Sequence, residues 1–137
     1  MLKFFSEEID FKLPFPQKTS KWIKTISISE GYEMGDLNYI FCTDDYLLEI
    51  NKQYLDHDYY TDIITFDNSE EEGKIEGDIY VSVDRVKENA IEFGANFETE
   101  LRRVLIHGLL HLMNYTDTSE ELKAQMRAKE DEYLLTY

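Results

Sequence analysis

Two histidines four positions apart, His107 and His111, are the residues whose types and spacing suggest chemistry most directly. If the run around them is helical, both imidazoles lie on one face about one turn apart, where they can reach a single ion. Their neighbours are mostly apolar, and an unpaired polar ring buried among them would cost roughly 1–3 kcal/mol. A shared metal would satisfy both rings. Two packed histidines bonded to backbone or carboxylate groups would fit the same spacing.

Asp117 is the candidate third ligand, six positions after His111 in the short stretch 114–118 between two expected helices. Asn114 tolerates the left-handed backbone that ends a helix, so the chain can turn sharply there. That elbow would carry the Asp117 carboxylate back towards the open side of the two rings. Two histidines and one carboxylate leave a fourth position for water, as in catalytic zinc sites. With 29 acidic residues in the chain, an aspartate within reach is also expected by chance.

Composition restricts the other possibilities. The chain has 137 residues, 42% of them hydrophobic, so we expect a single domain over residues 1–137 with its own core. Cys42 is the only cysteine, which excludes an intramolecular disulfide and a thiolate zinc site. We therefore expect a reducing, cytoplasmic compartment. No run approaches the ~20 apolar residues of a membrane span, and acidic residues follow the start too soon for a secretory signal.

The formal net charge of −15 is awkward for a protein that handles nucleic acid, because phosphate binding normally relies on a positive field. An acidic surface that favours solubility explains this charge equally well. Local basic groups form a possible path for RNA: Lys18, Lys21 and Lys24 share one side of an expected helix, and Arg102 and Arg103 precede the histidines. A stripe at this spacing is also typical of a solvated helix face.

Hydrophobic periodicity predicts the elements that must position these residues. We expect helices over 18–28, 44–55, 83–93, 98–113 and 119–134, and strands over 37–42, 62–66 and 77–83. The last two strands would form a hairpin across the acidic loop 68–73. Thr118 would cap the last helix in a capping box with Glu121. Strands and helices do not alternate strictly, so we predict an α+β fold: one small mixed sheet of about four strands covered by helices, with the metal site on the penultimate helix and the elbow after it.

The segment HGLLHLMNYTD, residues 107–117, resembles the signature H-G-x-L-H-L-x-G-Y-D-H of the YbeY family of metal-dependent endoribonucleases. Six positions match it: His107, Gly108, Leu110, His111, Leu112 and Tyr115. The segment 50–66 is similar to the family's L-N-x-x-Y-R-x-x-D-x-P-T-D-V-L-S-F. The matching residues there are Asn51, Tyr54, Thr61, Asp62 and Phe66, and further matches are Gly77-Asp78-Ile79, Met126 and Glu130. The resemblance covers roughly residues 45–132.

Three positions depart from the family pattern. Asp117 stands where the family has its third histidine, Asn114 replaces a glycine at the elbow, and Leu55 replaces an arginine associated with RNA handling. The resemblance implies one divalent metal ion held by His107, His111 and Asp117. Zinc is expected, and the carboxylate makes the site harder and more tolerant of nickel, iron or manganese. Compared with three histidines, it should acidify a bound water less.

The function implied by the resemblance is metal-dependent cleavage of single-stranded RNA during ribosomal-RNA processing, notably at the 3′ end of small-subunit RNA, and in ribosome quality control. RNA would be the substrate, and the ribosome or ribosomal proteins would be partners. Thr61, Asp62 and Thr65 would line the substrate-binding groove. Asp62 and Asp78 would orient groups near the metal, or else cap strand ends.

Two other functions are compatible with parts of the same pattern. The spacing of the histidines also occurs in zinc proteases, but these place a general-base glutamate beside the first histidine, where this chain has Gly108. Peptide hydrolysis by that mechanism is therefore disfavoured. The second alternative is a non-catalytic, metal-stabilised adaptor that docks on the ribosome and binds a basic protein partner through its acidic surface.

Overall fold

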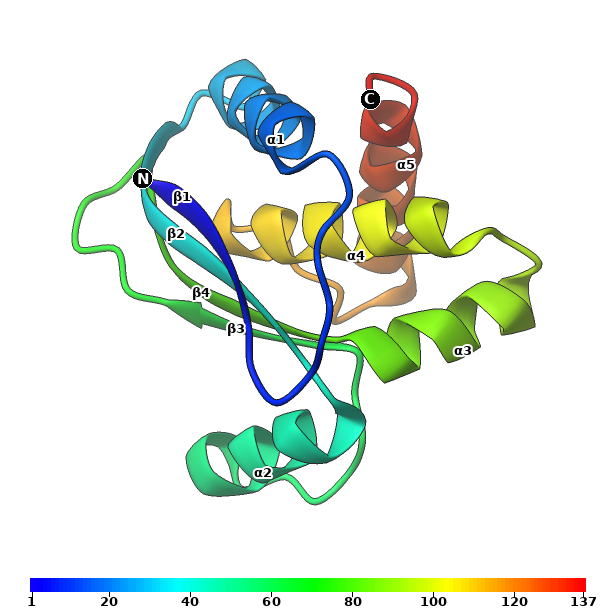
Figure 1. Cartoon of the computed structure of the whole chain (residues 1–137). Coiled ribbons are helices and arrows are strands. Elements are labelled where there is room, and N and C mark those ends of the chain that lie inside the picture. The colour runs from blue at the N-terminus through cyan, green and yellow to red at the C-terminus, as the bar shows by residue number, and fades with distance from the viewer.

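Four strands form one mixed sheet with five helices around it, in a computed structural model that describes all residues, 1–137 (Figure 1). The elements are β1 (Leu2–Ser6), α1 (Pro16–Ser29), β2 (Glu33–Cys42), α2 (Asp44–Leu55), β3 (Ile63–Asp67), β4 (Lys74–Ser82), α3 (Val83–Phe93), α4 (Phe97–Leu112) and α5 (Glu120–Leu134). The strand order is β1-β2-β4-β3. β1 and β4 run parallel to β2, and β3 pairs antiparallel with β4. The predicted α+β fold and mixed four-stranded sheet are confirmed.

The two faces of the sheet follow from the alternation of side chains along each strand. Tyr39 of β2 and Ile79 and Val81 of β4 belong to the main core, to which α1 and α4 contribute. On the other face, Cys42, Leu47 and Ile64 form a small separate cluster that includes α2. The sheet thus has one face covered by several helices and one face with only α2 against it.

Helix α4 lies close against the sheet because it carries a glycine in the contact. A Cβ at Gly108 would lie 2.7 Å from Cδ1 of Ile63 and 3.0 Å from Cγ2 of Ile79. The helix begins at a side-chain cap, where Oδ1 of Asn96 accepts from the backbone N–H of Thr99 at 2.8 Å. The close contact at Gly108 sets the position of the neighbouring His107 relative to β3 and β4.

The predicted elbow after α4 is confirmed. Asn114 has φ of 70°, the left-handed conformation that asparagine tolerates better than most residues. The backbone N–H of Tyr115 reaches back to the carbonyl of Leu110 at 3.0 Å, which closes the helix end. The chain then crosses residues 116–118 to α5, so Asp117 lies on a short and tightly anchored connection.

The structure corrects several boundaries. β1 was not predicted, because LKFFS is short and its pairing partner lies more than 30 positions away. Helix α1 begins at Pro16 rather than 18, since proline fits the first turn of a helix. The predicted N-cap of the last helix was wrong by one position: Ser119, not Thr118, accepts from the backbone N–H of Leu122. The predicted β3–β4 hairpin is confirmed.

None of the helices combines the length and apolarity that crossing a membrane requires.

Candidate metal centre

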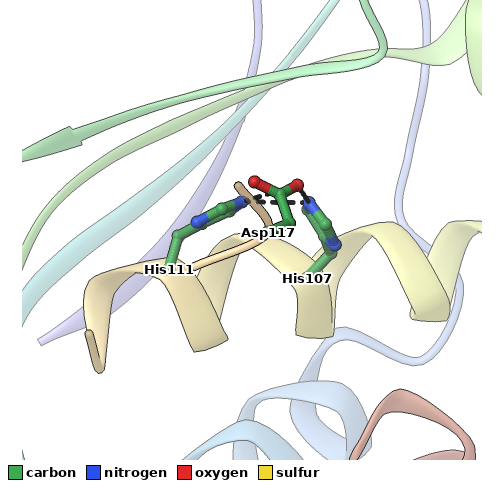
Figure 2. Close-up of side chains that lie close together, drawn as sticks. All are labelled: His107, His111 and Asp117. Atoms are coloured by element: carbon green, nitrogen blue, oxygen red, sulfur yellow. Dashed lines mark hydrogen bonds and ion pairs between the residues drawn. The ribbon is translucent and has the colours of Figure 1, made fainter. Parts of the chain in front are cut away.

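The side chains of His107, His111 and Asp117 converge at one point beside α4 (Figure 2). The two Nε2 atoms lie 3.0 Å apart. Oδ2 of Asp117, arriving from the elbow, lies 3.7 Å from Nε2 of His107 and 3.8 Å from Nε2 of His111. One ligand atom from each residue falls within 4.8 Å of the others. The three residues singled out from the sequence are therefore brought together, in a group that could hold a metal ion.

The outer nitrogens of both rings are already occupied by protein acceptors. Nδ1 of His107 lies 2.7 Å from Oε2 of Glu130, and Nδ1 of His111 lies 3.2 Å from the backbone carbonyl of Tyr115. A carbonyl and an ionised carboxylate only accept, so each Nδ1 must be the donor. In a neutral ring Nε2 then carries the free lone pair.

This tautomer assignment tests whether the site fits a metal. With both Nδ1 atoms donating, two Nε2 lone pairs face each other at 3.0 Å. They repel unless a cation or a shared proton lies between them. A divalent ion accepts both lone pairs and also attracts the Asp117 carboxylate, and imidazole and carboxylate are ordinary ligands of zinc and similar ions. The donor set therefore fits a divalent metal.

Glu130 orients His107 and is itself held by Arg103. Only 4% of Glu130 is exposed, and its Oε1 accepts from Nη1 of Arg103 at 3.0 Å. The second guanidinium nitrogen, Nη2, donates to Asp131 at 2.7 Å. Carboxylates that bind the outer nitrogen of a ligating histidine fix its tautomer and raise its basicity. The sequence signal for Glu130 was its match to the family's last helix, but only the structure shows this contact. Because Arg103 is paired with Glu130 and Asp131, it is not part of the predicted path for RNA.

The two rings differ in how readily they take up a proton. Burial lowers the pKa of His107, but its hydrogen bond and ion pair with Glu130 outweigh burial, so the pKa is raised. Burial and the neighbouring His107 charge lower the pKa of His111. Without metal, His107 is thus the first ring to become protonated as the pH falls.

The predicted substrate-side residues lie at the start of β3 and along it. Burial raises the pKa of Asp62, while the charge of His107 lowers it, and Nδ2 of Asn89 donates to Asp62 at 3.4 Å. Thr65 pairs with Ile79, the residue that touches α4 at the glycine contact. Alternation along β3 puts Thr65 on the same face of the sheet as Ile63 and α4. The Thr61 hydroxyl points to the carbonyl of Ile63 at 3.5 Å.

Asp78 and Leu55 have other surroundings. Asp78 accepts from Nδ2 of Asn38 at 2.9 Å, within the sheet rather than at a strand end. Because Ile79 faces α4, its neighbour Asp78 faces the opposite side of the sheet and does not orient the metal ligands. Leu55, where the family has an arginine, ends α2 with 40% of its surface exposed.

Comparisons with known proteins extend these observations. A family model described as "Endoribonuclease YbeY" matches residues 4–137. A Cytophaga hutchinsonii protein named Endoribonuclease YbeY is 55% identical over 128 residues, which are 93% of this chain and 90% of that protein. A Porphyromonas gingivalis protein of the same name is 42% identical over an alignment that covers 98% of this chain and 88% of that protein. The solution structure of a Thermotoga maritima protein has a TM-score of 0.72 at 31% identity, over 98% of this chain and 87% of that one.

Proposed function

The chain belongs to the Endoribonuclease YbeY family, and we propose that it is a metal-dependent endoribonuclease that hydrolyses single-stranded RNA during ribosomal-RNA maturation. The 3′ end of small-subunit RNA and ribosome quality control are the proposed settings, with the ribosome or its proteins as partners in the cytoplasm. The observation that carries the proposal is the convergence of two Nε2 lone pairs and one carboxylate in a chain 55% identical to a relative named for this activity.

His107, His111 and Asp117 are the proposed ligands of one divalent ion, with zinc first and nickel, iron or manganese as alternatives. Bound there, the ion would supply Lewis acidity towards a phosphodiester and lower the pKa of a water. Two neutral imidazoles and one carboxylate give this site a net charge of +1 with the ion, against +2 for three histidines. This lower charge is why we expect activity to require a higher pH than in relatives with three histidines.

The chain's own groups do the positioning. Glu130 and the Tyr115 carbonyl hold the two rings so that both Nε2 atoms face the same point. On the β3 side, Thr61, Asp62 and Thr65 are the proposed contacts for the RNA strand. Asp62 is close enough to His107 for the two charges to influence each other, and burial raises the pKa of the Asp62 carboxyl.

Peptide hydrolysis by a glutamate-assisted zinc mechanism does not fit position 108. Gly108 has no carboxylate to act as a general base, and even a Cβ at this position would lie 2.7 Å from Cδ1 of Ile63. The adaptor alternative is not favoured either, because the relatives that cover most of the chain are named as endoribonucleases.

Cleavage of a labelled single-stranded RNA by the metal-loaded protein tests the proposal. We expect cutting that chelator abolishes, that added metal restores, and that His107→Ala removes while the protein stays folded. His57→Ala is the matched control, because the side chain of this exposed histidine interacts with the neighbouring Tyr59 and not with the metal centre. Cleavage that survives both chelator and His107→Ala would come from a contaminant. Absence of cleavage by the metal-loaded wild type would overturn the proposal and favour the adaptor.

A further inference from the structure

One stretch of this acidic chain carries positive charge alone. Residues 11–29, which lead into α1 and form it, contain four lysines and no acidic residue, in a chain of net charge −15. On α1 itself, Lys18, Lys21 and Lys24 follow one another at intervals of three. Spacing of three keeps side chains on neighbouring positions of one helix surface. The sequence pattern alone could not say whether acidic residues elsewhere neutralise them.

The structure shows that they are not neutralised. Neither these lysines nor Lys3 of β1 forms an ion pair. Other cations, by contrast, are used internally: Arg85, Arg103 and Lys129 each bind two carboxylates. Lys18 lies over the ring of Tyr137, at 4.2 Å from its centroid. Lys3, Lys21 and Lys24 remain available to an anionic ligand.

These three lysines line one open groove of about 800 Å³ between β1 and α1. β1 is an edge strand of the sheet (Figure 1). Two large apolar side chains at the groove are exposed: Phe5 by 45% and Ile28 by 72%. No residue of α4, α5 or the elbow lines the groove, so it is separate from the metal centre.

The surroundings of the metal centre explain why a second anchoring surface would be useful. Beside the elbow, a pocket that includes Leu112 and Asn114 is lined by Asp67 and the acidic run Glu70–Glu72, and its one cation, Lys74, is already paired with Glu76. These carboxylates repel phosphate. Leu55 also supplies no charge where the family has an arginine. Most of the attraction for a long RNA must therefore come from elsewhere on the protein.

We propose that the β1–α1 groove, defined by Lys3, Phe5, Lys21, Lys24 and Ile28, binds the backbone of single-stranded RNA outside the segment that is cut. A basic groove with an exposed aromatic side chain is the usual combination for single strands, where lysines meet phosphates and bases stack. The inference rests on the proposed RNA substrate. An acidic peptide laid along the β1 edge is the competing occupant, and the experiments below separate the two.

Binding is measured first, on the full-length protein in the presence of chelator so that cleavage does not interfere. Fluorescence anisotropy with a labelled single-stranded RNA of about 20 nucleotides covers more than one site of ~4–16 nucleotides. For Lys21→Gln/Lys24→Gln we expect about tenfold weaker binding and a salt slope smaller by roughly 1.4, since each phosphate contact on a single strand contributes about 0.7. Phe5→Ala should weaken binding without changing the salt slope. The control, Lys87→Gln/Lys123→Gln, changes the net charge equally on α3 and α5 and should bind as wild type.

Cleavage by the metal-loaded enzyme then tests the separation from the metal centre. We expect Lys21→Gln/Lys24→Gln to raise KM for the long RNA about tenfold, leave kcat unchanged, and cut a short RNA of about four nucleotides as wild type does. Equal losses on both RNAs, or binding equal to the control, would overturn the groove as an RNA site, and the second result would favour a peptide. RNA binding is measured without metal, so it tests the groove independently of nuclease activity. If the proposed nuclease activity is wrong, the wild-type protein will cut neither RNA, whatever the binding experiment shows.

Discussion

Replacing Glu130 with glutamine tests how the proposed histidine ligands are held. The glutamate accepts from two donors at once, Nδ1 of His107 at 2.7 Å and Nη1 of Arg103 at 3.0 Å. A glutamine of the same shape has one accepting oxygen and one donating nitrogen. If its oxygen faces Arg103, its N–H₂ group meets Nδ1 of His107 and forces the proton onto Nε2, where it blocks the metal. If its oxygen faces His107, two donors meet at Arg103.

These contacts set the expected losses of metal affinity and of stability in Glu130→Gln. Loss of a carboxylate behind a ligating histidine typically lowers metal affinity about 10- to 100-fold, which is roughly 1.4–2.7 kcal/mol. The metal-free protein should also lose stability, because Arg103 loses a buried partner. Breaking a buried ion pair can cost 3–5 kcal/mol, but Arg103 keeps Asp131 at 2.7 Å. We therefore expect a loss of about 1–3 kcal/mol, the usual range for a buried group left unpaired.

The assay is competition for metal against a chromophoric chelator, with thermal unfolding measured on the metal-free and metal-loaded proteins. Asp131→Asn is the matched control: it removes the other partner of Arg103, which is 59% exposed, and leaves the His107 contact intact. This control should cost less than about 1 kcal/mol, as exposed ion pairs do, and bind metal as wild type. If Glu130→Gln also binds metal within about twofold of wild type, that is within ~0.4 kcal/mol, then Glu130 does not set the state of His107.

Four further outcomes are expected. Asp117→Ala should release most of the metal from the purified protein, which elemental analysis measures. Asp117→His should retain the metal and, by raising the charge of the site, shift the pH profile of cleavage to lower pH, which rate measurements check. Metal affinity should fall as the pH drops through the raised pKa of His107, above its ordinary value of 6.5, because a protonated ring cannot bind metal. The His107–Glu130 contact in metal-free protein should act oppositely, stabilising it fully below pH 6.5 and losing effect as the pH rises through that pKa; unfolding curves with and without metal test this sign. Glu30→Gln should lower the unfolding free energy by about 1–3 kcal/mol in denaturant titrations, since this carboxylate accepts from both Tyr115 and Tyr133.

The parts of the structure that the sequence predicted are those encoded locally. The histidine spacing needed only a helix, and Asn114 needed only its tolerance of a positive φ, which is 70° here. The β3–β4 hairpin followed from two short strands around an acidic loop. Strand β1 was missed because its pairing partner Leu37–Phe41 lies more than 30 positions away, and no local pattern encodes that contact.

The contacts that hold the proposed metal ligands are also formed between residues far apart in the sequence. Glu130 reaches His107 from 23 positions further along the chain, and Glu30 holds the side chain of Tyr115 from 85 positions away at 2.6 Å. The carbonyl of Tyr115 in turn accepts from His111. These contacts depend on how α1 and α5 pack against α4, which hydrophobic periodicity does not specify. Arg103 shows the same limit: its sequence position suggested RNA binding, while its side chain serves Glu130 and Asp131.

Asp117 and the distribution of charge over the protein surface both affect how strongly the protein attracts a polyanion such as RNA. With one carboxylate among its proposed ligands, the metal centre would carry one positive charge less than a three-histidine site, and the acidic residues beside the elbow would weaken its field further. Tight binding of a long RNA at the centre alone is therefore disfavoured. Lysines that remain unpaired in the β1–α1 groove offset this deficit at a distance from the cut. If the lysine groove attracts the RNA and the metal centre cuts it, KM should depend strongly on salt and RNA length. The kcat for a bound strand should depend on neither.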